Sequence, residues 1–250
     1  MKLTNILDIA LKAATIILKN GAETYRTEET VKYICKGYNI KDVESIVTPT
    51  SIFISLKDND NNSLTRVKSI KHRTINLDKI SLINDFSYQL QNKEISYKKA
   101  MARLEEINKH KQIYRDSLAI TASSIAGGCY VIIMNLAFIN FFPVFLANFI
   151  AQLIATKVRF LKKVNFIPYI AAAFTSTSII LLSYNYNLVT NLEIAIIGGI
   201  LSFVPGVAAT NATRDAINGD LISASARLIE VIIISLSLAT GVALSLGGFA

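Results

Sequence analysis

Long apolar stretches without a charged side chain fill the second half of this 250-residue chain, and they restrict its fold more than any other feature. They run over 118–156, 164–192, 194–213 and 231–250. A transmembrane helix needs about 20 apolar residues. The first stretch is therefore long enough for two spans, and each of the others for one. We expect five membrane-spanning helices, near 118–139, 141–157, 165–184, 192–211 and 228–248.

The first half of the chain has the opposite composition. Residues 1–117 hold 20 of the 26 Lys and Arg side chains and 14 of the 18 Asp and Glu side chains. Such a charge density is typical of a water-exposed domain. The predicted fold is therefore membrane α-helical, with a small cytoplasmic α/β domain over 1–115 followed by a transmembrane domain of five helices over 116–250. The net charge of +8 fits a lipid bilayer with anionic headgroups better than a nucleic-acid partner.

Basic residues between the expected spans predict the orientation of the chain in the cell membrane. They are Lys157, Arg159, Lys162 and Lys163 after the second span, and Arg214 and Arg227 between the fourth and the fifth. Loops rich in Lys and Arg favour the cytoplasmic side. We therefore expect a multi-pass protein whose N-terminus is cytoplasmic and whose C-terminus is outside.

Local patterns predict the elements of the N-terminal domain. Apolar residues at helical spacing over 3–18 predict an amphipathic helix, which either packs within the domain or lies on the membrane surface. A second helix is expected over 23–38, and 43–56 has the alternation of one β-strand. The turn residues that follow predict a hairpin with a returning strand over 64–70. Two more helices are expected over 77–90 and over 97–107, the latter with Ser96 as its N-cap.

The pair Pro205–Gly206 interrupts the fourth apolar stretch. Proline lacks an N–H and clashes with the carbonyl four residues before it, so backbone acceptors around Leu201 and Ser202 are freed. Gly206 lets the chain bend or lets another helix approach closely. Within a bilayer, an irregular backbone is tolerated only against protein or a watery cavity. A half-helix N-terminus favours an anionic carboxylate. The break therefore predicts a substrate site beginning at Pro205, and the alternative is an ordinary proline kink in a packed helix.

Two motifs resemble those of a known family, the threonine/serine exporter (ThrE) family, in its split, YjjP-like form. The first motif, GAETYRTE, has the matching residues Gly21, Ala22, Arg26 and Glu28. The second motif, FVPGVAATNATRDAINGD, has Pro205, Gly206, Asn211, Arg214, Asp215, Gly219 and Asp220. The order of the parts, a cytoplasmic domain before five spans, also resembles this family and covers essentially the whole chain.

The resemblance implies a subunit of a secondary exporter. Its expected substrates are small amino acids such as threonine and serine, or short dicarboxylates such as succinate. Some family members carry a second set of spans, whereas this chain ends at Ala250. We therefore expect a half-transporter that works with a smaller YjjB-like membrane subunit, and an odd number of spans suits one unit of an inverted repeat. A homo-oligomer is the alternative.

The candidate site residues form two sets. The substrate-binding or pathway set is Pro205, Gly206, Asn211, Arg214, Asp215, Asp220, Asn148 and Gln152. The gating or interdomain set is Gly21, Glu23, Arg26 and Glu28. The charged members of the first set suit a zwitterionic or acidic substrate or the transfer of protons, unless they only form a solvated loop. The second set either gates entry at the cytoplasmic ends of the spans or forms surface ion pairs.

Polar and small residues within the spans complete the prediction. Asn148 and Gln152 stand four apart and so share one helix face, where they either line a path or bond to a neighbouring helix. The glycine pairs are expected to allow close helix packing. They are Gly127–Gly128, Gly198–Gly199 and Gly247–Gly248.

Enzymatic functions find little support in the sequence. Neither His72 nor His110 has a second histidine or a cysteine at ligand spacing, and no phosphate-binding loop or nucleophile elbow occurs. We expect no catalytic residue, no metal and no cofactor, and transport driven by a gradient. The alternative from another class is a membrane-anchored sensor or regulatory scaffold with a ligand-binding cytoplasmic domain. An anchor of that kind needs neither the Pro205–Gly206 break nor Asn148 and Gln152.

Overall fold

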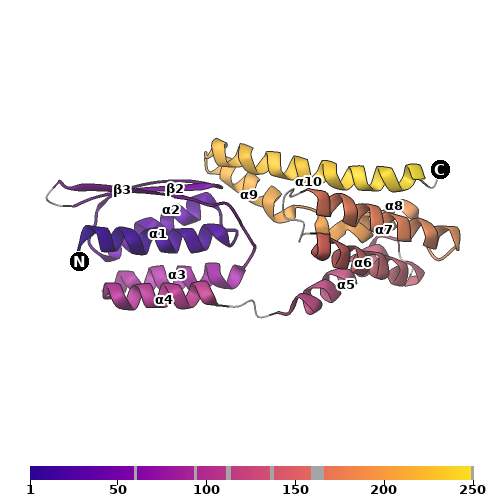
Figure 1. Cartoon of the computed structure of the whole chain (residues 1–250), viewed down its shortest axis with the longest axis horizontal. Helices are drawn as coiled ribbons and strands as arrows, with labels where there is room; N and C mark the ends of the chain where they lie inside the picture. The colour runs from indigo at the N-terminus through magenta and orange to yellow at the C-terminus, as the bar shows by residue number, and fades with distance from the viewer. Residues whose placement is uncertain (59–60, 93–94, 111–113, 136–137, 159–165, 249–250) are drawn as a thin grey trace. The chain divides into compact units, whose positions relative to one another are not determined.

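The computed structural model of the chain describes all residues except 59–60, 93–94, 111–113, 136–137, 159–165 and 249–250. The chain divides into two compact units (Figure 1). The first unit joins Met1–Gln112 to a late segment, Ala209–Leu228, and the second consists of Ile113–Ala208 and Ile229–Ala250. A segment that begins near the end of the fourth apolar stretch therefore belongs to the same compact unit as the N-terminal residues.

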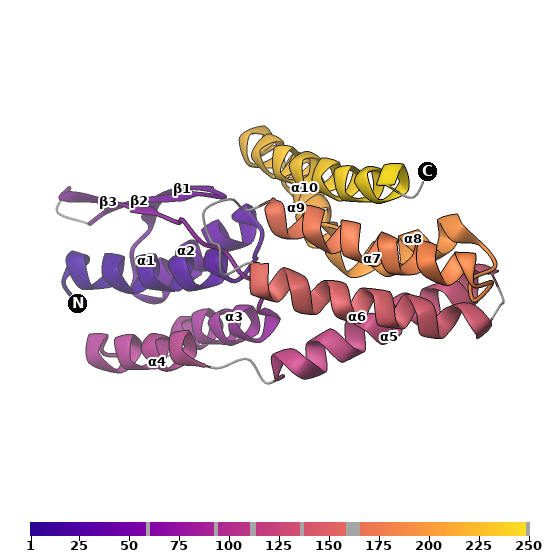
Figure 2. The same cartoon turned by 45° about the vertical axis from the view of Figure 1, so that its right-hand side comes forward.

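The N-terminal part of the first unit has three layers, which are visible in Figures 1 and 2. Its elements are α1 (Leu3–Lys19), α2 (Thr24–Gly37), β1 (Asp42–Thr48), β2 (Ser51–Lys57), β3 (Ser63–Ser69), α3 (Leu77–Asn92) and α4 (Tyr97–Lys109). The antiparallel sheet, in the order β1-β2-β3, covers one side of α1 and α2, and α3 and α4 cover the other. This arrangement buries α1 from both sides.

Helix α1 supplies much of the core of this unit. Ile6, Leu7, Ile9, Ala13 and Ile17 are each at most 2% exposed, although they do not all share one face. A helix that lies on a membrane surface buries a single apolar face. The structure therefore favours the first of the two alternatives for α1, a helix packed within its domain.

The sheet corrects the predicted hairpin. The alternating stretch 43–56 forms two strands, β1 and β2, whose facing ends Thr48 and Ser51 pair across a turn at Pro49–Thr50. Proline favours the first central position of a tight turn because its ring fixes φ. Apolar alternation continues on both sides of this turn, so the periodicity alone does not show the break. The returning strand then becomes β3 of a three-stranded sheet.

The other helices of the first unit follow the sequence pattern closely. Helix α4 begins after Ser96, which occupies the N-cap position, although its side chain makes no capping hydrogen bond. Its buried residues Ala100, Leu104 and Ile107 recur at helical spacing. In β2, Ile52, Ile54 and Leu56 are all buried on the face that packs against α1.

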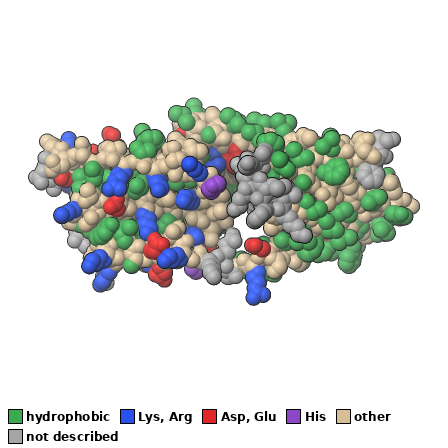
Figure 3. All heavy atoms as spheres, in the orientation of Figure 1, with side chains coloured by type: hydrophobic (Ala, Val, Ile, Leu, Met, Phe, Trp, Pro, Cys, Tyr) green, Lys and Arg blue, Asp and Glu red, His purple; other side chains and the backbone are tan. Residues whose placement is uncertain are grey.

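The second unit consists of apolar helices. They are α5 (Asp116–Asn135), η1 (Phe138–Asn140), α6 (Phe141–Val158), α7 (Ile167–Asn185), α8 (Leu192–Ile200), η3 (Leu201–Phe203), the first turn of α9 (Gly206–Ile217) and most of α10 (Leu221–Gly248). Among the described residues, four helical segments are long and apolar enough to cross a membrane, and the bent pair Leu192–Phe203 and Gly206–Ile217 makes a fifth if it is one span. Figure 3 shows hydrophobic side chains over this unit and charged ones over the first. The membrane class of the fold is thus supported, with four or five spans.

The longest helix, α10, belongs to both units. Its 28 residues extend for about 42 Å, whereas a hydrocarbon core about 30 Å thick needs about 20 residues. The excess corresponds to its first two turns, which lie in the first unit. The orientation of the spans stays a prediction. Of the residues on which it depends, Arg159, Lys162 and Lys163 lie outside the described residues, as does the side chain of Lys157.

Glycines allow α5 and α8 to pack closely in the second unit. A Cβ added at Gly127 would lie 2.6 Å from the carbonyl oxygen of Gly198, and a Cβ added at Gly198 would lie 2.5 Å from Cγ2 of Val131. These two glycines let the backbones approach as the sequence predicted. Gly247 and Gly248 differ, because an added Cβ meets no atom within 4 Å among the described residues.

Candidate functional site

The fourth apolar stretch is interrupted where Pro205 predicts it. Helix α8 ends at Ile200, a short 3-10 turn, η3, follows, and Val204 has an extended backbone with φ −63° and ψ 130°. Helix α9 begins at Gly206. No described atom lies within 4 Å of a Cβ added at Gly206. Among the described residues, this glycine therefore does not serve the close approach of another helix, which was one of its two predicted roles.

The backbone acceptors near this break meet protein groups. The side-chain amide of Asn148 on α6 donates to the carbonyl oxygens of Gly199 at 3.0 Å and of Gly198 at 3.4 Å. Its Oδ1 accepts a hydrogen bond from the hydroxyl of Ser202 at 3.0 Å. The carbonyl of Leu201 accepts from the N–H of Val204 at 3.3 Å. Asn148 therefore supplies hydrogen bonds to carbonyl oxygens at the end of α8, which a helix end buried in hydrocarbon needs.

Gln152 lies one turn further along the same face of α6. Its amide donates to the hydroxyl of Ser123 on α5 at 2.8 Å. Asn148 and Gln152 thus connect α6 to two different helices. A direct role of either side chain in binding substrate stays a prediction.

An apolar groove of about 460 Å³ lies beside the break. Its lining residues are Ile196, Ile200, Val204 and Pro205 before α9, and Ser235, Leu238, Ala239, Val242, Ala243 and Leu246 on α10. Apart from Ser235, the residues that line the groove have apolar side chains. The lining suits an apolar occupant better than a carboxylate.

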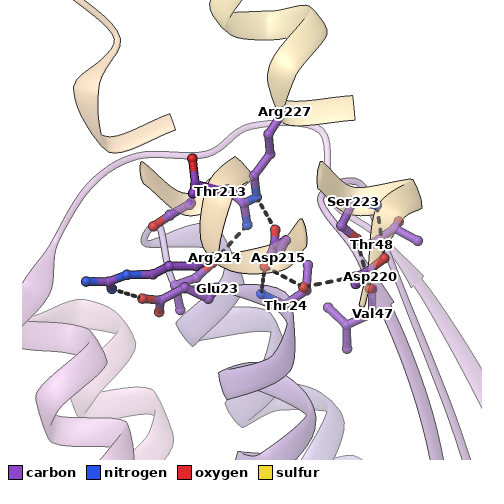
Figure 4. Close-up of polar contacts among 12 residues, drawn as sticks. Glu23, Thr24, Val47, Thr48, Thr213, Arg214, Asp215, Asp220, Ser223 and Arg227 are labelled. Atoms are coloured by element: carbon purple, nitrogen blue, oxygen red, sulfur yellow. Dashed lines mark hydrogen bonds and ion pairs between the residues drawn. The ribbon is translucent and has the colours of Figure 1, made fainter. Parts of the chain in front are cut away.

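The two sequence motifs meet within the first unit, although about 190 residues separate them (Figure 4). Gly21 adopts φ +96° in the turn between α1 and α2, a conformation that glycine tolerates best, and its carbonyl accepts from the side-chain amide of Asn211 at 3.0 Å. Glu23 forms an ion pair with Arg214 on α9, and its second oxygen lies 3.7 Å from Nε of Arg26. Glu23 is buried and Arg214 is half exposed.

A buried ion pair lies at the centre of this cluster. Nε of Arg227 on α10 lies 2.8 Å from Oδ2 of Asp215 on α9, and their side chains are 4% and 0% exposed. Arg227 also donates to the carbonyl of Ala22 at 3.1 Å. The other oxygen of Asp215 accepts from the hydroxyl of Thr24 at 2.8 Å and from its N–H at 3.4 Å. Both buried charges are thus paired and hydrogen-bonded, as burial of charge requires.

Asp220 stands at the turn between α9 and α10. Gly219 before it has φ +84°, and Oδ1 of Asp220 accepts from the N–H of Ser223 at 3.0 Å as the cap of α10. Its Oδ2 lies 3.0 Å from the hydroxyl oxygen of Thr24. Thr24 therefore contacts both aspartates of the second motif (Figure 4).

The pKa values of two glutamates in the first motif are shifted in opposite directions: that of Glu28 is raised and that of Glu23 is lowered. Burial raises the pKa of Glu28, and nearby Asp220 and Asp215 add to this, against the hydrogen bond that Oε1 accepts from the N–H of Val47 at 3.0 Å. Burial acts to raise the pKa of Glu23 as well. Hydrogen bonds from its own backbone N–H and from Arg214 outweigh this effect, so the pKa of Glu23 is lowered. Glu23 is thus an ionised partner for Arg214, and Glu28 is a half-buried acid close to two other acids.

Replacing Glu28 by glutamine is expected to stabilise the folded chain at neutral pH. A raised pKa in the folded state means that the stability contribution of Glu28 is present at acidic pH and is lost as pH rises through the folded pKa. Glutamine keeps an oxygen for the N–H of Val47 but carries no charge. The melting temperature of Glu28→Gln should exceed that of the native chain at pH 7, and the gap should close in acid. The exposed Glu29→Gln on the same helix is the matched control, and an equal gain there would contradict the explanation.

The sequence analysis missed Thr24 and Arg227 as members of the site. Thr24 lies inside the first motif but matches none of its characteristic positions. Arg227 stands just before an apolar run, so the sequence analysis used it only as a basic residue at the start of the fifth span. Their partners Asp215 and Asp220 lie far from Thr24 in sequence, and no local spacing indicates these contacts.

Comparison with known proteins supports the resemblance seen in the two motifs. The family described as "Putative threonine/serine exporter" (ThrE) matches residues 8–247. A protein of Mycobacterium tuberculosis described as "Probable threonine/serine exporter" is 20% identical over 247 residues, which cover 97% of this chain and 46% of that protein. The "Probable succinate transporter subunit YjjP" of Klebsiella aerogenes is 23% identical over 244 residues, which cover 95% of this chain and 92% of that protein.

No solved structure matches this chain. The chain spans less than half the length of the mycobacterial relative and nearly the whole length of the one from Klebsiella. The family match includes both motifs and nearly every described helix. The chain therefore belongs to the threonine/serine exporter (ThrE) family.

Proposed function

We propose that this chain is a subunit of a secondary exporter in the cell membrane. It moves small amino acids of the threonine and serine type, or short dicarboxylates such as succinate, out of the cell. The observation that carries this proposal is the family match over residues 8–247, which includes both motifs. The names of the two relatives and the four or five membrane-length helices support it. The family match does not favour a membrane-anchored sensor.

The proposal includes a partner. A relative of similar length is named as a transporter subunit, and another relative of the chain is about twice as long. Both facts support a second membrane subunit of the smaller, YjjB-like kind that completes the pathway. The positive loops support a cytoplasmic N-terminus and an external C-terminus.

Arg214 is the residue we propose to receive the substrate carboxylate. Its side chain is 53% exposed, whereas Arg227 is buried in a pair with Asp215. A carboxylate that reaches Arg214 competes with Glu23 for the same guanidinium, since ionised carboxylates are its preferred partners. When the substrate carboxylate replaces Glu23 as the partner of Arg214, substrate binding releases Glu23 of the first motif. In this scheme Gly21, Glu23, Arg26 and Glu28 form the gate, and Asn211, Asp215 and Asp220 hold α9 beside it.

The remaining proposed residues concern the path through the membrane. Asn148 and Gln152 support it because they place polar atoms inside the helix bundle. Pro205 and Gly206 support it because they end one helix and begin another within an apolar stretch. We place the path at the side of this break that Asn148 contacts and not in the apolar groove, with α9 directing its N-terminal amides toward a passing carboxylate.

Export from cells tests this function. Cells that contain the chain and its partner subunit should release preloaded labelled threonine or succinate faster than cells that contain either protein alone. Arg214→Gln should weaken the apparent affinity for the substrate about tenfold or more, because a hydrogen bond to a charged group contributes about 1.5–3 kcal/mol. Arg103→Gln, on the exposed face of α4, is the control for expression and charge. Unchanged release for both substrates would refute the exporter function.

A further inference from the structure

One hydroxyl group lies between two carboxylates in the first unit. Oγ1 of Thr24 is 2.8 Å from Oδ1 of Asp215 and 3.0 Å from Oδ2 of Asp220 (Figure 4). A threonine hydroxyl has one proton to donate and two lone pairs that accept. If both aspartates are ionised, one carboxylate oxygen receives the hydroxyl proton and the other faces a lone pair. A second proton within this group of three resolves the conflict.

The surroundings identify which aspartate carries that second proton. Both oxygens of Asp215 already accept hydrogen bonds, one from Arg227 and one from Thr24, so the second proton is better placed on Asp220. Asp220 uses Oδ1 as the cap of α10. In the part of the chain that the structure describes, the partner found for its Oδ2 is the hydroxyl of Thr24. A proton on this oxygen donates to Thr24, which then donates to Asp215.

The charges near this group are unbalanced. Around Thr24, the acids are Asp215 and Asp220 together with Glu28, whose pKa is raised by burial and by these two aspartates. Arg227 on α10 neutralises Asp215, and Lys32 on α2 acts on Glu28. Glu23 and Arg214 pair with each other, and β1 contributes the backbone of Val47. Like charges held close together favour the uptake of a proton by one of them.

We propose that Asp220, Thr24 and Asp215 form a proton-binding site, in which Asp220 takes up one proton from water and Thr24 links it to Asp215. The bound proton joins the N-terminus of α2 to the turn between α9 and α10. When it leaves, two carboxylates face one hydroxyl and their repulsion weakens that contact. This inference rests on the proposed export function for its physiological role, since a secondary exporter needs a site for its coupling ion. The existence of the site itself does not depend on export.

Infrared difference spectroscopy of the purified full-length chain, recorded during a pH titration, tests the site directly. A protonated carboxylic acid has a C=O stretching band that a carboxylate lacks. In acid every Asp and Glu side chain gives such a band, so the band of the site is the component that persists to higher pH than the components of the exposed acids. We expect this band in the native chain and its loss in Asp220→Asn, whose amide still donates to Thr24 and whose side chain still caps α10. Asp85→Asn, on the exposed face of α3, should keep the band. A titration in which Asp220→Asn retains the full band would overturn the proposal.

Substitutions of Thr24 provide a second test, in which no charge is changed. Thr24→Val removes the hydroxyl and should lower the midpoint of the band by about one pH unit, a tenfold loss of proton affinity, because one hydrogen bond contributes about 1 kcal/mol. Thr24→Ser keeps the hydroxyl and should titrate like the native chain. Equal midpoints in all three proteins would also overturn the proposal.

The spectrum and the export assay separate the two proposals. A band that depends on Asp220 in a chain without export activity supports the proton site and refutes the proposed function. Export by a chain in which Asp220→Asn leaves the band unchanged supports the function and refutes the site. The melting temperature of each variant checks that it is folded.

Discussion

Arg227→Met should lower the free energy of unfolding by about 3–5 kcal/mol, because it leaves the carboxylate of Asp215 buried without its cation. The two side chains are 4% and 0% exposed, so water does not replace the lost partner. The carbonyl of Ala22 loses a donor as well. The change is measured by denaturant unfolding of the purified full-length chain in detergent.

A matched variant and a double mutant test this explanation. Arg103→Met breaks an exposed ion pair with Glu106 on α4 and should change the free energy by well under about 1 kcal/mol. Adding Asp215→Leu to Arg227→Met removes the unpaired charge, so the double mutant should be more stable than Arg227→Met alone. A cost for Arg227→Met as small as that for Arg103→Met would mean that this pair is not buried in solution.

The pair also explains why the charged residues after the break do not behave as a loop. The segment 211–220 contains an arginine and two aspartates and starts at the end of an apolar stretch, so a solvated loop was one of the two predictions. In the structure most of it is helical, and Asp215 and Asn211 are buried against the turn at Gly21. The contacts of Asp215 with Thr24 and Arg227 hold α9 in the first unit. Substrate contact at Arg214 remains a proposal, whereas the buried pair is a structural element.

The sequence predicted the class of the fold from simple physical constraints. Charge-free stretches long enough to cross a bilayer predicted apolar helices, and Pro205 predicted the interruption after α8, because each rule depends on a few neighbouring residues. The resemblance also identified both motifs of the cluster. In the sheet, apolar alternation hid the turn at Pro49, because each strand alone has the same period.

Contacts between distant segments could not be predicted in this way. Glu23 and Arg214 are 191 residues apart, and each has nearer residues of opposite charge along the chain. Counting charges by segment placed Arg227 at the start of the fifth span and did not indicate its partner Asp215, because the count contains no information on tertiary contacts. The same limit applies to Asn148, whose polarity indicated either a path or a helix contact. Only the positions of Gly198, Gly199 and Ser202 show the contact that it makes.

Gly127→Ala is the second substitution expected to have a large effect. The new Cβ would lie 2.6 Å from the carbonyl oxygen of Gly198 and 3.2 Å from Nδ2 of Asn148. The first of these atoms belongs to the backbone, and the second is hydrogen-bonded to that backbone, so neither moves away without separating α5 from α8. We expect a loss of about 1–3 kcal/mol, the usual cost of overpacking.

Gly247→Ala is the matched control for this substitution, because both glycines are helical and the Cβ at 247 meets no described atom within 4 Å. Alanine raises helix propensity by about 1 kcal/mol at either position. The difference between the two variants therefore isolates the clash. It is measured as resistance to denaturing detergent in the purified chain, and equal resistance would show that α5 and α8 do not pack backbone against backbone. If the difference is found, Asn148 is fixed by the same contact that holds the end of α8, and the polar atoms beside the break are positioned by helix packing before any substrate arrives.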